Sequence, residues 1–139
     1  PSSAASDVYK RQGLTLLAET IGDTIARAAA DPALAEYAAA LRTRLDTLVA
    51  TTVAVWSAGD VAVSLANATA YLEATGHIVI AWMWLEQLLA VGASTGDFYD
   101  GKRAAAQYFY RYELPKTGPQ FELLAALDRT TLDTDPAWL

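Results

Sequence analysis

The only histidine of the chain lies in its most apolar stretch, Asn67 to Leu89, close to Glu73. Glu73 and His77 are four residues apart, and on a helix this spacing can present two ligands to one metal ion. A di-iron helical bundle needs more, because it uses carboxylates on two helices and a Glu-x-x-His pair on each of two others. One histidine cannot supply that set. We therefore interpret His77 as a structural residue and expect no metal site.

Nucleophilic catalysis has no better support. The sequence has no cysteine, which excludes disulfides, thiolate metal sites and cysteine nucleophiles. Serines and threonines are present, but no pattern of neighbouring bases would activate one. The glycines are scattered, and no phosphate-binding loop of the G-x-x-x-x-G-K-[ST] type occurs. We therefore expect no catalytic and no cofactor-binding residue in this chain.

A run of aromatic residues surrounds one arginine near the end of the fourth expected helix. Tyr108, Phe109, Tyr110 and Tyr112 flank Arg111, and such a cluster can stack on nucleic-acid bases. The net charge of −6 argues against this use, because nucleic-acid surfaces need clustered Lys and Arg. Helical spacing favours a core stripe with an exposed rim. We expect no nucleic-acid partner.

Four basic residues lie along the same part of the sequence, namely Lys102, Arg103, Arg111 and Lys116. They could form a modest basic face on one helix. A solvated face is the simpler interpretation. Contact with an anionic ligand or with an acidic partner surface is the alternative.

The chain is rich in tryptophan for its length, with Trp56, Trp82, Trp84 and Trp138. Tryptophan and tyrosine are enriched at protein interfaces. A bundle with more apolar surface than it can bury is expected to dock on a partner. Our hypothesis is therefore that part of this apolar surface is an interface.

The composition bounds the fold that positions these residues. A length of 139 residues favours one domain. Alanine, the strongest helix former, is the most frequent residue, and strand-type alternation is lacking. Residues 1–12 are small, polar and patternless, so we interpret them as a linker remnant that is disordered or fraying, ahead of a single helical domain over 13–139. No uninterrupted apolar run of about 18 residues occurs. We expect no membrane span, and a cytoplasmic location by default.

The first two helices are predicted by apolar residues at three- and four-residue steps. The first helix should begin near Gln12 or Leu14 and end at Asp31-Pro32, which should also start the second helix. The second should end near Ala58, before Gly59-Asp60. The expected faces are Leu14, Leu17, Ile21, Ile25 and Ala28 in the first helix, and Leu34, Tyr37, Leu41, Leu45, Leu48, Thr52 and Val55 in the second.

The third helix is expected to be continuous from about Val61 to Gly92 and to be the central one. Two neighbouring stripes indicate burial on more than one side: Leu65, Ala68, Leu72, Thr75, Val79 and Met83, and Tyr71, Ile78, Trp82, Leu85 and Leu89. Gly76 inside a helix indicates close packing by a neighbour or a bend. We expect Tyr71, Gly76 and Trp82 to be packing determinants.

The fourth helix should be capped by Asp97 and end near Glu113, before Pro115. Its expected facing stripe is Phe98, Lys102, Ala105, Phe109 and Tyr112. A turn at Thr117-Gly118-Pro119, a short helix from Gln120 to Asp128 and an extended tail with Trp138 docked on an apolar surface should follow. Four amphipathic helices joined by short turns pack antiparallel. The predicted fold is an all-α, up-down antiparallel four-helix bundle with a short C-terminal helix and an extended tail.

Several short motifs in order resemble one family. They are Asn67-Ala68-Thr69-Ala70-Tyr71-Leu72, Gly76-His77, Ala81-Trp82, Phe98-Tyr99-Asp100-Gly101-Lys102 with Ala105, Tyr112-Glu113-Leu114-Pro115-Lys116 and Leu127-Asp128-Arg129-Thr130-Thr131-Leu132. Their order and spacing resemble the C-terminal helical domain of long-form bacterial acyl-CoA dehydrogenases, a group that includes the 3-methylmercaptopropionyl-CoA dehydrogenases. The resemblance covers roughly Leu14 to Leu139.

The resemblance implies a parent flavoenzyme that oxidises acyl-CoA to 2,3-enoyl-CoA with FAD and passes electrons to an electron-transfer flavoprotein. The flavin pocket and the catalytic glutamate of such enzymes lie in a preceding dehydrogenase core. Glu73, Glu86 and Glu113 match no catalytic motif, so the chain alone is expected to be inactive and to hold no cofactor.

The resemblance also implies the partners. The chain is expected to pack on the dehydrogenase core of the same polypeptide, or on the other subunit of a homo-oligomer, and to shape an interface or the CoA entrance. Lys102, Arg103, Arg111 and Lys116 are the candidates for contact with CoA phosphates. The alternative is a free-standing helical interaction bundle without enzymatic activity.

Overall fold

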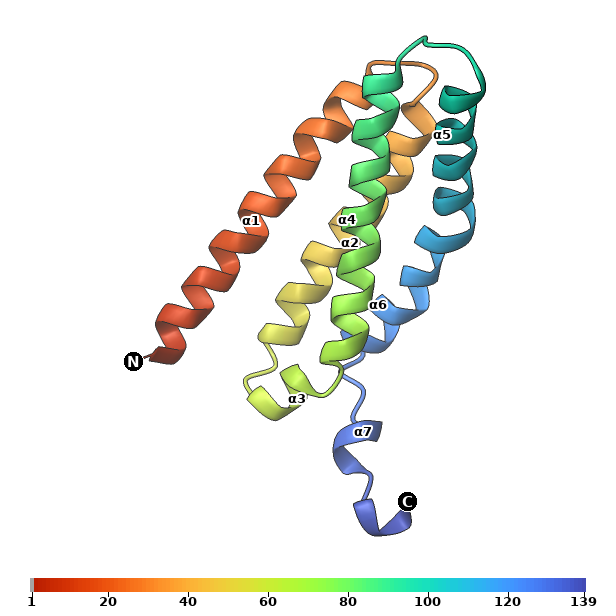
Figure 1. Cartoon of the computed structure of the whole chain (residues 1–139). Coiled ribbons are helices and arrows are strands. Elements are labelled where there is room, and N and C mark those ends of the chain that lie inside the picture. The colour runs from red at the N-terminus through yellow and green to blue at the C-terminus, as the bar shows by residue number, and fades with distance from the viewer. Residues whose placement is uncertain (1) are drawn as a thin grey trace.

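The computed structural model describes the backbone of residues 2–139 and the side chains of Tyr9 and residues 11–139. Four helical rods pack side by side, and successive rods run in opposite directions (Figure 1). They are α1 (Ser2–Ala29), α2 (Ala35–Trp56), α4 (Ala68–Val91) and a fourth rod that begins with α5 (Asp97–Tyr108). The described residues contain no strand. The predicted all-α bundle is confirmed.

The face of α1 is as predicted, but its start is not. Ile21, Ile25 and Ala28 are buried, and Leu14 and Leu17 pack against the core. The helix begins at Ser2 rather than near Gln12 or Leu14, because the segment from Ser2 to Gln12 contains no proline that would stop it. The interpretation of residues 1–12 as a linker remnant stays a prediction.

Asp31 organises the connection from α1 to α2. Its carboxylate accepts a hydrogen bond from the amide of Ala33 at 2.9 Å, and its carbonyl accepts one from the amide of Leu34 at 2.9 Å. These bonds form a separate turn, so α2 begins at Ala35 rather than at Pro32. The predicted seam of α2 is largely confirmed, since its buried residues are Ala38, Leu41, Leu45, Leu48, Thr51 and Val55.

The third helix is interrupted, which corrects the prediction of one helix from Val61 to Gly92. A short helix, α3 (Val61–Leu65), is separated from α4 by Ala66 and Asn67. The Asn67 side chain donates a hydrogen bond to the carbonyl of Asp128 at 2.9 Å. The Ser64 hydroxyl donates one to the carbonyl of Val55 at 2.8 Å. These bonds to distant residues hold α3 across the end of the bundle.

One face of α4 forms the centre of the core, and it is not the first stripe that we expected. The buried residues are Ala74, Ile78, Ala81, Leu85 and Leu88. In the first expected stripe Leu72 is 68% exposed and Met83 is 53% exposed. Of the second stripe, Ile78 and Leu85 are buried and the others pack partly. The helix α4 has more apolar residues than one buried face requires. The distribution of apolar residues in the sequence therefore could not show which face of α4 is buried.

By length and composition alone, α4 is long and apolar enough to cross a membrane, with a mean hydropathy of 1.3. One such helix is weak evidence, because the core helix of a helical bundle can have the same properties. In this structure α4 packs against α1, α2, α5 and α6.

The fourth rod continues past Pro115, which corrects the predicted end near Glu113. After α5 come a wider π-helical turn, η1 (Phe109–Glu113), a 3-10 turn, η2 (Leu114–Lys116), and α6 (Thr117–Ala125). The expected turn at 117–119 is therefore the first turn of a helix. Thr117 closes this junction by donating a hydrogen bond to the carbonyl of Leu114 at 2.7 Å.

The facing residues of the fourth rod also differ from the prediction. Ala106, Tyr110 and Leu114 are buried, whereas Phe98 and Tyr112 are exposed. The cap of α5 is Gly96, one residue before Asp97.

The C-terminal segment lies beyond the end of the bundle (Figure 1). It forms α7 (Thr130–Asp133) and a final turn, η3 (Pro136–Trp138), where an extended tail was expected. Trp138 is 75% exposed, so the prediction that it docks on an apolar surface of this chain is wrong.

Candidate functional site

Glu73 and His77 do not converge. The His77 ring donates from Nδ1 to the carbonyl of Glu73 at 2.8 Å, and its Nε2 lies 3.6 Å from the Glu113 carboxylate. The Glu73 carboxylate instead accepts a hydrogen bond from Gln120 at 3.0 Å. Across the part of the chain that the structure describes, no group of three His, Cys, Asp or Glu side chains could hold a metal ion. The ring of His77 stacks on Phe109, with centroids 5.9 Å apart, which gives it a packing contact between α4 and η1.

A polar cluster joins α1 to α4, and sequence reasoning missed its central residue. Thr24 is buried, its hydroxyl donates to the Glu86 carboxylate at 2.6 Å, and it accepts from the Trp82 indole at 2.7 Å. Arg27 forms an ion pair with the same Glu86. Thr24 lies on the apolar side of α1 between Ile21 and Ile25. A threonine within the predicted apolar face of this helix was the feature of the sequence that could have indicated a buried polar contact. The cluster fixes the distance between two rods.

Two of the three expected packing determinants have specific contacts within the chain. Trp82 binds Thr24 as described, and the Tyr71 hydroxyl lies 2.8 Å from the hydroxyl of Thr52 on α2. Gly76 differs, because a Cβ placed there would meet no heavy atom within 4 Å. The close approach expected at Gly76 is therefore absent among the described residues.

Tyr110 ties the fourth rod to α4. Its hydroxyl donates to the carbonyl of Ala81 at 2.7 Å, and its ring meets Tyr37 edge to face at 4.9 Å. Burial raises the pKa of Tyr110 well above its ordinary value, and the nearby Tyr37 adds to this shift. The phenol therefore acts as a permanent hydrogen-bond donor and not as an acid.

Each of the four candidate basic residues has a partner within the chain. Lys102 donates to the Gln87 side chain at 2.8 Å and lies over the rings of Trp84 and Phe98. Lys116 pairs with Glu113 at 3.2 Å.

Arg103 holds the connection between α4 and α5. Its guanidinium donates to the carbonyl of Gly92 at 3.1 Å, to the carbonyl of Ser94, and to Asp100 at 2.9 Å. The guanidinium of Arg111 lies against the side-chain amide of Gln107. Arg103 is thus a structural residue of the turn, whereas Arg111 remains exposed on the surface.

An uncharged stripe runs along the outside of α4. It consists of Leu72, Gly76, Ile80 and Met83, and we call it the outer α4 stripe; its three side chains are exposed. Glu73 and Glu86, the two acids of this helix, bind Gln120 and the Thr24 cluster. No charge therefore interrupts the stripe.

The exposed rings of Tyr108 and Tyr112 stack on each other on the fourth rod. Their centroids are 4.6 Å apart. This pair of rings adds exposed apolar surface to the rod that packs against α4.

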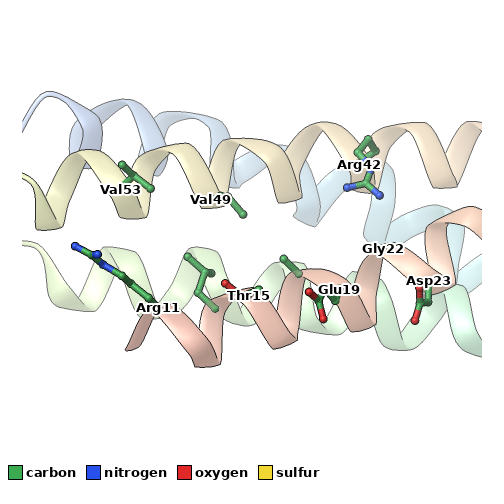
Figure 2. A pocket seen from close by; sticks show the side chains of 10 residues that line it. Arg11, Thr15, Glu19, Gly22, Asp23, Arg42, Val49 and Val53 are labelled. Carbon is green, nitrogen blue, oxygen red and sulfur yellow. The ribbon is translucent and has the colours of Figure 1, made fainter. Parts of the chain in front are cut away.

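A second surface feature is a cleft between α1 and α2 with a volume of about 650 Å³. Figure 2 shows its charged residues along the two helices, with Arg11 toward one end and Asp23 and Arg42 toward the other. Its lining is Arg11, Leu14, Thr15, Ala18, Glu19, Gly22, Asp23, Arg42, Val49 and Val53.

The described residues thus form a helical bundle in which the candidate polar residues contact one another and part of the outer surface is apolar. A family model described as Acetyl-CoA dehydrogenase C-terminal like matches residues 17–135. The chain belongs to this family of C-terminal domains of acyl-CoA dehydrogenases. Searches of curated proteins and of solved structures found no match.

Proposed function

We propose that this chain is an accessory domain that packs through the outer α4 stripe on the dehydrogenase core of its own polypeptide. The observation that carries the proposal is the family match over residues 17–135, together with a stripe of exposed apolar side chains on the central helix. The 3-methylmercaptopropionyl-CoA group is the proposed subfamily. FAD, acyl-CoA and the electron-transfer flavoprotein belong in this proposal to the parent enzyme, which is expected in the cytoplasm.

The chemistry of the stripe supports a protein partner. An outward helix face is normally polar, but Leu72, Ile80 and Met83 are exposed and share their face with Gly76. A glycine on an exposed helix surface lets another backbone approach closely. Among the described residues nothing occupies the space next to Gly76. Gly76 therefore suits a contact made by the partner surface.

A contact with CoA phosphates is a second proposed role, and the structure changes which residue should carry it. Arg103 already binds three groups of its own chain, and Lys102 is held by Gln87 and two rings. Of the four candidate basic residues, Arg111 is the exposed one that has no carboxylate partner among the described residues. Arg111→Glu in the parent enzyme should raise the KM for acyl-CoA while kcat is retained. An unchanged KM would remove this role.

The docking proposal is tested in two steps. The first step is to determine the coding sequence upstream of this chain, which is expected to encode a flavin-binding dehydrogenase core. A start codon just before Leu14 would instead favour the free-standing interaction bundle.

The second step places charges in the proposed interface. Leu72→Asp and Met83→Asp in the parent enzyme should lower its thermal stability and its kcat/KM, because each buries an unpaired carboxylate. Leu123→Asp on α6 is the matched control, since Leu123 is also exposed but lies on another rod. Equal effects of all three substitutions would contradict docking through the outer α4 stripe.

A further inference from the structure

The residues that follow α6 form an acidic arm beyond the end of the bundle (Figure 1). We call residues 128–139 the arm. It contains three aspartates and one arginine, so its net charge is −2. The arm is attached to the α3–α4 break by the hydrogen bonds from Asn67 to the carbonyl of Asp128 at 2.9 Å and from Thr131 to the carbonyl of Ala66 at 2.8 Å. Trp138 is 75% exposed, so the arm presents an aromatic ring together with negative charge.

The fourth rod carries an exposed ridge of opposite character. Tyr108 and Tyr112 are 56% and 62% exposed, and their rings stack on each other. Arg111 lies between them in the sequence and has no carboxylate partner among the described residues. The nearest acid in the sequence, Glu113, is paired with Lys116. We call Tyr108, Arg111 and Tyr112 the tyrosine ridge, and it carries one open positive charge.

We propose that the tyrosine ridge receives the arm of a second copy of this chain, and that the two copies exchange arms about a two-fold axis. In the arm Asp135 precedes Trp138 by three residues, and on the ridge Tyr108 precedes Arg111 by three. An antiparallel arrangement therefore places Trp138 of the partner subunit against Tyr108. The same arrangement places Asp135 of the partner subunit beside Arg111. Each contact joins two aromatic rings and one pair of opposite charges.

Both surfaces are ordered before they meet. The Asp135 carboxylate caps η3 by accepting a hydrogen bond from the amide of Ala137 at 2.8 Å, and the two rings of the ridge support each other. Preorganised side chains lose little freedom on binding. Trp, Tyr and Arg are also the residues that dominate the binding energy of interfaces. The contact area is small, so we expect a dissociation constant on the order of 10–100 μM.

Charge and position favour this occupant of the ridge. The arm of the same chain lies beyond the end of the bundle (Figure 1), and Trp138 and both ridge tyrosines are exposed, so the contact is not made within one chain. A basic partner surface would repel Arg111, whereas the arm brings carboxylates to it. Mutual exchange also closes the assembly at two copies, as a two-fold dimer requires. The dimer leaves the outer α4 stripe uncovered and does not rest on the proposed docking.

Sedimentation equilibrium of the 139-residue chain measures the association. Arg111→Glu takes the net charge from −6 to −8, and Asp135→Lys takes it to −4. If only overall repulsion mattered, the first would weaken the dimer and the second would strengthen it. The proposal expects both to raise the dissociation constant about tenfold or more, because each places two like-charged pairs in the interface. Trp138→Ala should have an effect of the same size.

An equimolar mixture of Arg111→Glu and Asp135→Lys separates the charge pairing from a general effect. In the mixed dimer the glutamate at position 111 of one chain faces the lysine at position 135 of the other, and the second contact is native. Association should therefore return to within about threefold of the wild-type dissociation constant. Arg42→Glu and Asp23→Lys are controls with the same charge changes in the cleft between α1 and α2, and they should leave the dimer unchanged. Circular dichroism verifies that every variant is folded.

A neutral substitution separates the dimer from the proposed contact with CoA phosphates, since both use Arg111. Asp135→Asn keeps an oxygen that can cap η3 and removes only the charge. It should weaken the dimer about threefold or more. The arginine of the ridge is unaltered in this variant, so the KM of the parent enzyme for acyl-CoA should not rise.

Three results would overturn the proposal. The first is a wild-type chain that stays monomeric at concentrations on the order of 500 μM. The second is a dimer that Trp138→Ala and both charge reversals leave intact, since the interface would then lie elsewhere. The third is a mixture that fails to regain association. A monomeric chain whose parent enzyme is destabilised by Trp138→Ala would instead assign the arm to the dehydrogenase core.

Discussion

The Thr24 cluster allows a stability prediction that can be worked from distances. Thr24→Val keeps the shape of the side chain and removes one hydroxyl. That hydroxyl donates to Glu86 at 2.6 Å and accepts from the Trp82 indole at 2.7 Å. Valine can make neither bond. The indole N–H is then left without its partner between two packed helices.

The expected cost follows from the two bonds. A neutral hydrogen bond contributes about 1 kcal/mol net, and one to a charged group about 1.5–3 kcal/mol. The side chain of Glu86 is 38% exposed and keeps its ion pair with Arg27, so solvent replaces part of the charged bond. We therefore expect a loss of about 2 kcal/mol in the free energy of unfolding. With a urea m-value of about 2 kcal/mol per M, the midpoint should fall by about 1 M.

Urea unfolding followed by circular dichroism measures this shift. Thr20→Val is the matched control, because the Thr20 hydroxyl binds only the exposed carbonyl of Leu16 in its own helix. Both substitutions change helix propensity equally, so the control should lose less than about 0.5 kcal/mol. Trp82→Phe combined with Thr24→Val should cost about 1 kcal/mol less than the sum of the single changes. Equal shifts for Thr24→Val and Thr20→Val, or full additivity with Trp82→Phe, would refute the role of the cluster.

Three further predictions use the same unfolding assay. Gly76→Ala should stabilise the isolated chain by about 0.5–1 kcal/mol, because a Cβ there meets no neighbour; destabilisation would show a contact that the structure lacks. Trp138→Ala should change the free energy of unfolding by less than about 0.5 kcal/mol, since the ring is exposed. A larger loss would show that Trp138 packs against the bundle. The raised pKa of Tyr110 means that the folded chain holds the phenolic proton more tightly than the unfolded chain. The contribution of this phenol to the free energy of unfolding is therefore complete below about pH 10 and is lost as the pH rises further. Tyr110→Phe should therefore show a smaller decline in stability between about pH 9 and 11 than the wild type, and identical declines would contradict the assignment.

The helices that obey a simple period could be predicted from the sequence. In α1 and α2 the apolar residues recur at helical steps and face one core, so Ile21, Leu41 and Leu48 were identified from spacing and are buried. The family could also be recognised from the order of short motifs, and the match over residues 17–135 agrees with it.

The errors share a physical cause, which is that distant contacts override local signals. The break before α4 falls at Ala66 and Asn67, where no glycine or proline stands, and it depends on the bond from Asn67 to Asp128. The fourth rod passes Pro115 because this residue lies at the start of η2, where the missing backbone N–H of proline is not required. The buried residues Ala106, Tyr110 and Leu114 recur at four-residue steps, and Ala106 and Tyr110 lie one position after Ala105 and Phe109 of the expected stripe.

The partners of the polar residues lie on other helices, so the sequence could not identify them. Glu73 and His77 have metal-ligand spacing, but their side chains bind Gln120 and Glu113 on the fourth rod. The two basic residues Lys102 and Arg103 appeared available in the sequence and are held by their own chain. The role of Thr24 was not predicted, because its partners Trp82 and Glu86 are about sixty residues away on α4.

Met83 provides the most direct test of docking on a dehydrogenase core. It is the only methionine in the sequence, it lies in the outer α4 stripe, and it is 53% exposed in this chain. Its rate of oxidation by dilute hydrogen peroxide can be read by mass spectrometry in the isolated chain and in the parent enzyme. If the stripe is covered by the core, oxidation of Met83 should be at least about fivefold slower in the parent enzyme. Equal rates in the two proteins would contradict docking through this face of α4.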